Sequence, residues 1–105
     1  MLKNLALLVS CASALYGCPH AQYGDENAML IEANCLFHNS DENKDHKLSH
    51  HSKKVLITKY LHNPQYSHAI VEEIKEDYGE YMSRNEFYGV YGYLKYHEEL
   101  EREQE

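Results

Sequence analysis

The stretch Asp41–Ser52 has the sequence DENKDHKLSHHS and is polar throughout except at Leu48. Groups with a ligating oxygen recur at every second position, as they do where a chain wraps around a metal ion and alternate side chains point inward. The candidate ligands, at the first, third, fifth, seventh and ninth positions, are Asp41, Asn43, Asp45, the Lys47 carbonyl and Ser49. The spacing therefore predicts a loop that can wrap a hard cation.

Helical patterns flank this loop on both sides. Leu36 and Phe37 lie on the expected buried face before it. Leu56 lies on that face after it, although Lys53 stands where an apolar residue is expected. A helix–loop–helix unit with this ligand spacing resembles the EF-hand family. The resemblance implies that the eighth loop residue, Leu48, pairs with the same position of a second loop through a short β-bridge.

A second break in the helical pattern can be aligned with the first loop. It begins at Lys75, 34 residues after Asp41, which is near the spacing of paired EF-hands. Met82 then matches Leu48. Glu86 falls at the twelfth position, where an EF-hand has its bidentate glutamate. The second segment therefore resembles a partner for the first.

The resemblance covers residues 27–96 and implies an all-α fold, a degenerate pair of EF-hand-like units made of four helices. Both loops depart from the family pattern. In the first, His46 replaces the glycine at the sixth position, and Ser52 replaces the glutamate at the twelfth. In the second, Lys75 puts a cation at the first position. The resemblance thus implies weak calcium binding, mainly by the first loop. The ligand positions of the second loop, which is expected to be inactive, are Asp77, Tyr81, Ser83 and Glu86.

The sequence also predicts where the helices begin. Asp25 or Asn27 can cap the first helix, and Ser67 can cap the third. Ser83 can cap the fourth, because Glu86 stands three residues later, at the spacing of a capping box. The first and second helices are expected to span residues 27–39 and 49–61.

The N-terminal residues are typical of a signal peptide. Lys3 supplies a positive charge, Leu5–Ala14 is apolar or small, and Ala12-Ser13-Ala14 offers a cleavage site. The run is too short for a membrane span, which needs roughly 20 apolar residues. A buried N-terminal helix and lipidation at Cys18 are alternatives. The expected organisation is a signal peptide at 1–17 with cleavage after residue 14 or 17, an N-terminal arm at 18–26, the EF-hand-like pair at 27–96 and a charged, solvated helical tail at 97–105.

Loss of such a leader leaves an acidic chain. The leader contains Lys3 but no acid, so 9 basic residues remain against 17 acidic ones, a formal charge of −8. This charge argues against nucleic-acid binding, which needs a basic surface. Cys18 and Cys35 remain as an even pair in an oxidising compartment and are predicted to form a disulfide. Two free thiols, or pairing between chains, are the alternatives.

Histidine and tyrosine are the other abundant residues that can bind ligands. Zinc or copper binding by the histidines near the first loop is an alternative to their being solvated side chains. Tyr93 and Tyr96 are expected to shield helix edges, with a tyrosine binding stripe as the alternative. The histidines near the first loop are His38, His46, His50 and His51.

The sequence contains no catalytic signature and no glycine-rich phosphate loop. We therefore expect a secreted, non-catalytic protein that binds calcium weakly. It would act as an extracellular structural or interaction protein, in a calcium-rich matrix or as an adaptor for another secreted protein. One alternative is a calcium-independent interaction module with the same fold, such as a venom or effector polypeptide. The other is a histidine-based zinc or copper binder.

Overall fold

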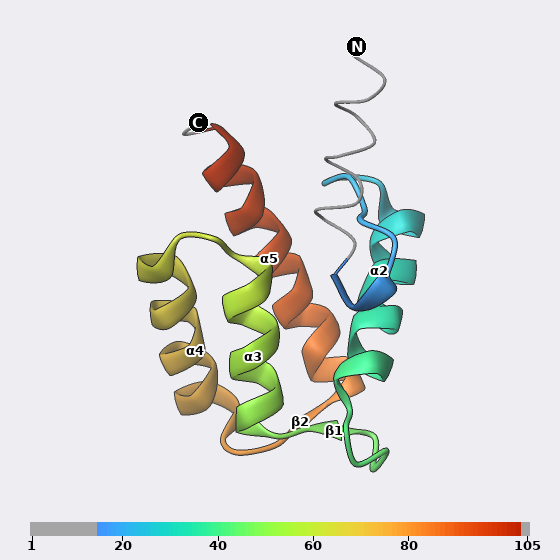
Figure 1. Cartoon of the computed structure of the whole chain (residues 1–105), viewed down its shortest axis with the longest axis vertical. Helices are drawn as coiled ribbons and strands as arrows, with labels where there is room; N and C mark the ends of the chain where they lie inside the picture. Colours follow the sequence, from blue (N-terminus) through green and yellow to red (C-terminus); the bar gives the residue numbers. More distant parts are fainter. Residues whose placement is uncertain (1–14, 104–105) are drawn as a thin grey trace.

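The computed structural model describes residues 15–103, so residues 1–14 of the expected signal peptide lie outside the described part of the chain. The described part is mostly helical, in agreement with the predicted all-α class, and it also contains one two-stranded sheet (Figure 1). No helix within residues 15–103 is long and apolar enough to cross a membrane. The elements are η1 (Leu15–Gly17), α2 (Glu26–Ser40), β1 (Lys47–Leu48), α3 (His50–Tyr60), α4 (Pro64–Tyr78), β2 (Met82–Ser83) and α5 (Arg84–Glu103).

Side-chain caps determine where the first three α-helices begin. The Asp25 carboxylate accepts a hydrogen bond from an amide in the first turn of α2, and the Ser49 hydroxyl does the same for α3. The prediction that Ser67 caps the third helix is wrong. Asn63 is the cap of α4, and Pro64 follows it at the first helical position, where the missing proline N–H costs nothing. Ser67 lies inside the helix and donates to the Pro64 carbonyl at 3.2 Å.

The start of α5 has the predicted capping box. The backbone N–H of Ser83 donates to the Glu86 carboxylate at 2.9 Å, and the N–H of Glu86 donates to the Ser83 hydroxyl at 3.3 Å. Reciprocal bonding of this kind satisfies two amides that the first turn of a helix leaves free. The Glu86 carboxylate therefore already has a structural role at the start of this helix.

The two loops are joined by a short antiparallel bridge, at the bottom of Figure 1. Leu48 pairs with Met82 and Lys47 pairs with Ser83, which is the register that the sequence predicts for the eighth loop positions. Leu48 and Met82 are both completely buried. The bridge therefore connects the two helix–loop–helix units through backbone hydrogen bonds and through the core.

One hydrophobic core lies between the helices, with α2 packed on α5 and α3 packed on α4. The rings of Phe37 and Phe87 meet at its centre, 5.8 Å apart, and such a pair contributes about 0.5–1.5 kcal/mol beyond its buried area. Leu56, Ile70 and Leu94 are buried around them. The helical stripes that the sequence predicts are therefore the faces that form the core.

The N-terminal arm is held to this core by its buried residues. The sulfurs of Cys18 and Cys35 are 2.08 Å apart, so the predicted pair forms a disulfide. Cys18 and Ala21 are buried, although they lie outside any α-helix. The arm therefore belongs to the folded domain.

The tail expected at residues 97–105 is helical as far as Glu103, as predicted, but residues 97–101 are half-buried rather than solvated. Helix α5 continues to Glu103, and the Glu98 side chain is only 16% exposed. The Glu101 carboxylate accepts hydrogen bonds from the N–H groups of His62 and Asn63, at 3.2 and 2.6 Å. Charged side chains thus attach the end of α5 to the connection between α3 and α4.

Candidate functional site: two bridged loops

The backbone of the first loop turns sharply at two residues. Lys44 and His46 have positive φ angles of 56° and 65°. Residues other than glycine adopt this left-handed conformation at a cost of roughly 1–2 kcal/mol. His46 stands where the EF-hand pattern has a glycine, and its positive φ angle is the one that a glycine would adopt there. The loop therefore has the curvature of an ion-wrapping turn even with histidine at this position.

Asp41 organises this turn. The residue is 5% exposed, and its carboxylate accepts hydrogen bonds from the N–H groups of His46 (2.8 Å) and Asp45 (3.3 Å). Burial alone raises the pKa of the Asp41 carboxyl, but these hydrogen bonds outweigh burial and hold that pKa below its ordinary value. The carboxylate is therefore ionised at neutral pH and fixed at the start of the loop.

The other candidate ligands of the first loop form two groups. Asn43 and Asp45 are exposed, and the Asp45 carboxylate accepts a hydrogen bond from the N–H of Lys47 at 3.3 Å. At the far end, the Ser52 hydroxyl lies 3.3 Å from the Ser49 hydroxyl, where a bidentate glutamate would be needed. With the Lys47 carbonyl, the loop offers about five oxygen ligands, fewer than the 6–8 that calcium takes. The residues therefore fit a calcium ion only with water completing its shell.

The second loop is shorter than the sequence predicts. Helix α4 continues through Asp77 and Tyr78, so only Gly79–Tyr81 separate it from β2. Gly79 ends the helix with a φ angle of 79°, a conformation that glycine adopts without steric cost. Asp77 is therefore a helical residue and cannot serve as the third ligand of an open loop. Tyr81 is half exposed, with the Lys47 ammonium 5.4 Å from its ring centre.

Lys53 supplies a cation to the second loop. Its ammonium donates to the Gly79 carbonyl at 2.9 Å, and the side chain is only 3% exposed. Burial lowers the pKa of Lys53, while the nearby Glu80 and Glu86 carboxylates raise it and only partly compensate. A hint of this contact is visible in the sequence, because Lys53 stands at a position of the helix where an apolar residue is expected. The second loop is thus closed by an ammonium group of the chain itself, and its residues do not fit a calcium ion.

Sequence reasoning missed a buried ionic cluster between α2, α3 and α5. Glu32 and Lys95 are each 1% exposed, and the Lys95 ammonium lies 3.2 Å from the Glu32 carboxylate. The hydroxyls of Tyr60 and Tyr91 both contact that carboxylate. Burial is the largest cause of the raised pKa of each phenol, and the Glu32 carboxylate raises it further. A signal existed, because Glu32 lies on the apolar face of its helix, three residues after Met29.

The arm and the outer end of α5 complete this ionic cluster. The Glu98 carboxylate lies 2.5 Å from the His20 ring and 3.0 Å from the Lys95 ammonium. Burial raises the pKa of Glu98, but hydrogen bonds from His20 and Lys95 outweigh burial and leave it below its ordinary value. The buried position of the ion pair suits a structural role better than a catalytic one.

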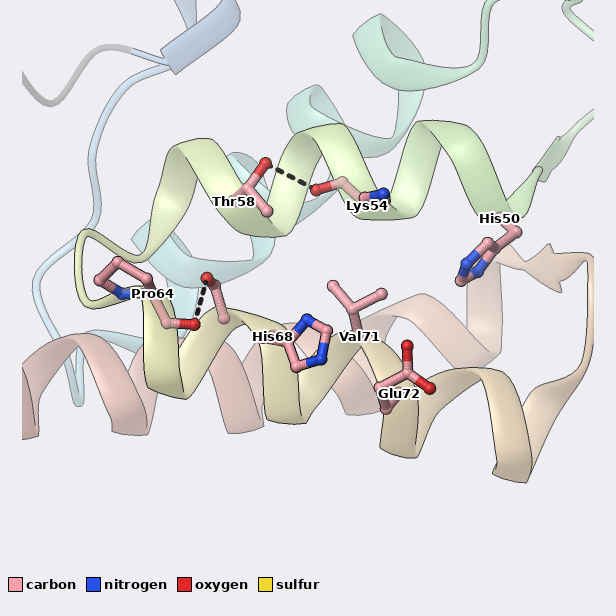
Figure 2. A pocket seen from close by; sticks show the side chains of 8 residues that line it. His50, Lys54, Thr58, Pro64, His68, Val71 and Glu72 are labelled. Carbon is pink, nitrogen blue, oxygen red and sulfur yellow. Dashed lines mark hydrogen bonds between the residues drawn. The ribbon is translucent and has the colours of Figure 1, made fainter.

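The histidines do not gather into a metal centre. Among residues 15–103, no three His, Cys, Asp or Glu side chains are grouped closely enough to hold a metal ion. His50 instead projects from the start of α3 into a groove of about 280 Å³ beside α4, which also contributes His68 and Glu72 (Figure 2). The other candidate histidines near the first loop, His38, His46 and His51, do not line this groove.

Comparison with protein-family models, curated proteins and solved structures gives no match to this chain. What the loops can bind therefore has to be inferred from their own residues.

Proposed function

We propose that the chain is a degenerate EF-hand pair that binds one calcium ion weakly in its first loop and acts as a non-catalytic, secreted structural or interaction protein. The main support is the register of the bridge between the loops. Leu48 and Met82, each at the eighth position of its aligned loop, face one another. An alignment that was wrong by one residue in either loop would not produce this pair.

The first loop supports the calcium part of this proposal in two ways. Its left-handed residues and the bonds from Asp45 and His46 to Asp41 arrange the turn before an ion arrives. Preorganisation of this kind lowers the entropy cost of binding. Against this, only two carboxylates are available and Ser52 replaces the bidentate ligand. An affinity in the range of extracellular modules, with Kd about 10⁻⁴–10⁻³ M, is therefore expected.

A second candidate function is supported by Lys53. Because its ammonium already closes the second loop, and because the bridge is supported by the buried side chains of Leu48 and Met82, the fold can serve as a calcium-independent interaction module. Under this alternative the first loop is a structural turn, and calcium has no specific effect on it.

Calcium titration followed by amide NMR spectra separates the two candidates. If the first loop binds calcium, the amides of Asp41–Ser49 should shift with one Kd, while those of Gly79–Tyr81 follow only weakly through the bridge. Asp41→Ala should abolish the shifts. Because Asp41 also accepts two hydrogen bonds, Asp41→Asn is the better-matched variant, and it too should lose binding. Glu86→Gln should retain it.

The controls distinguish specific binding from general attraction to an acidic surface. Magnesium at the same concentration should shift these amides much less, because it demands a tighter octahedral shell than this loop can build. Shifts spread evenly over the acidic surface would contradict a site in the first loop and favour the calcium-independent module.

A further inference from the structure

A second groove lies between α4 and α5, on the side of α4 away from α3. It is lined by the buried side chains of Ile74 and Val90 and by the exposed Gly89. Its volume of about 170 Å³ is below the 300–1,000 Å³ typical of sites for small-molecule ligands. At about 30 Å³ per water molecule, the space equals five or six waters, which is the scale of one long side chain.

The rim of this α4–α5 groove combines negative charge with aromatic rings. Glu73 and Asp77 contribute exposed carboxylates from α4, and neither forms an ion pair with any described residue. Tyr78 and Tyr93 are 37% and 44% exposed. Burial is the first cause that raises the pKa of Tyr93, and the Glu73 carboxylate is the second, so this acid lies beside the ring. Carboxylates next to an aromatic face attract cations.

No basic residue lines the α4–α5 groove among the described residues. At one edge of the groove, the ring of His97 packs edge-on against Tyr93 with 4.5 Å between the ring centres. A cationic group entering the groove would therefore meet two carboxylates that have no cationic partner among the described residues.

Gly89 provides the second, independent observation. It lies inside α5 with ordinary helical geometry, where glycine is less favourable than alanine. A Cβ atom built at this position would meet no atom of the chain within 4 Å, so packing does not require glycine. Gly89 is exposed at the edge of the groove, so a methyl group at this position would project into the open space beside it. Such positions are expected where another molecule approaches the backbone closely.

We propose that the α4–α5 groove binds an arginine side chain from a basic segment of a partner protein. The planar guanidinium can stack on Tyr93 while it donates to Glu73 and Asp77, which a lysine ammonium cannot do as well. This proposal rests on the interaction role proposed above and adds the class of partner, which is a protein with a basic segment. It does not involve calcium, because no residue of the first loop lines the groove.

Fluorescence polarisation with a labelled triarginine peptide, in EDTA and low salt, tests this proposal. The peptide should bind, and the neutral isostere tricitrulline should bind at least tenfold more weakly. Trilysine should also bind more weakly, and equal affinity for trilysine would overturn the arginine assignment. Working in EDTA keeps a failure of the calcium proposal separate from a failure of this one.

Matched variants locate the peptide on the surface. Gly89→Ala should weaken binding at least fivefold by filling the groove. Gly92→Ala, also helical and also without neighbours at its Cβ, should change it less than twofold. Both should raise the melting temperature slightly, so loss of fold cannot explain the difference. Equal binding by wild type and Gly89→Ala would overturn the proposal.

The charge variants give an independent comparison. Glu73→Gln and Asp77→Asn should each weaken triarginine binding at least tenfold. Glu72→Gln removes the same charge on the same helix but faces the other groove, so it should have less than a twofold effect. Equal losses for Glu72→Gln and Glu73→Gln would show attraction to acidic surface in general and would contradict a specific groove.

Discussion

Replacing Lys95 by methionine should destabilise the fold severely. The ammonium is 1% exposed and lies 2.9 Å from the Tyr60 hydroxyl, 3.0 Å from the Glu98 carboxylate and 3.2 Å from the Glu32 carboxylate. Methionine fills much of the same space but leaves Glu32 as a buried anion without its cation. The remaining partners of that carboxylate are neutral groups, which include the Ala21 amide at 3.1 Å.

The expected loss follows from the burial of this pair. Removing one partner of a buried salt bridge costs about 3–5 kcal/mol. The lower end is used here, because Glu98, the other carboxylate that loses the ammonium, is partly solvated and keeps His20 as a partner. About 3 kcal/mol lowers the melting temperature of a domain of this size by roughly 12–24 °C. Adding Glu32→Gln removes the unpaired anion, so the double variant should regain at least about 1 kcal/mol.

Urea denaturation followed by circular dichroism measures both effects. Lys75→Met, on the exposed face of α4, is the control for loss of a positive charge and should change the unfolding free energy by less than about 0.5 kcal/mol. If Lys95→Met costs less than about 1 kcal/mol, the ammonium is solvated and the buried ionic cluster does not hold the helices together. Additive effects of Lys95→Met and Glu32→Gln would also refute a direct pair.

Three further predictions concern the arm, acid stability and the first loop. Reducing the disulfide of Cys18 and Cys35, which are 17 residues apart, should cost about 3 kcal/mol in thermal unfolding; unchanged melting would mean that buried contacts alone hold the arm. Because the folded pKa of Glu98 lies below its ordinary value, its contribution is present above that value and lost as the pH falls through the folded pKa. Glu98→Gln should therefore flatten the acid side of a stability–pH curve, and an unchanged slope would contradict this. His46→Gly removes left-handed strain at φ 65° and should add about 0.5–1 kcal/mol to the free energy of unfolding in urea, and no gain would contradict strain at this residue.

The sequence was most informative where local chemistry decides the structure. The capping box at Ser83 and Glu86 needs only residue types at fixed spacing, and so does the turn at His46. The pairing of Leu48 with Met82 could be predicted because few apolar residues were available in either loop. The capping box and the turn are local, so the residues beside them in the sequence were sufficient. The pairing of Leu48 with Met82 is not local and followed from the resemblance to paired EF-hands.

Two of the errors are local: the Ser67 cap and the length of the second loop. The other errors concern contacts between distant residues. The burial of the helical tail depends on Glu98 and Glu101 meeting groups from the arm and from the α3–α4 connection. The buried pair of Glu32 and Lys95 joins two helices far apart in the sequence. A charged residue within a helical pattern indicates solvent exposure by default, and only the tertiary structure identifies its partner.

The calorimetric affinity of Ser52→Glu for calcium tests the central proposal most directly. Ser52 is both the twelfth loop residue and the third residue of α3, so a glutamate there supplies a bidentate ligand and also completes a capping box with Ser49. Ser52→Gln completes the same box without the charge and is the matched control. The proposal predicts that Ser52→Glu binds calcium at least tenfold more tightly than wild type, about 1.4 kcal/mol, while Ser52→Gln does not. Equal calcium affinity in all three proteins would mean that the loop does not wrap an ion in this register.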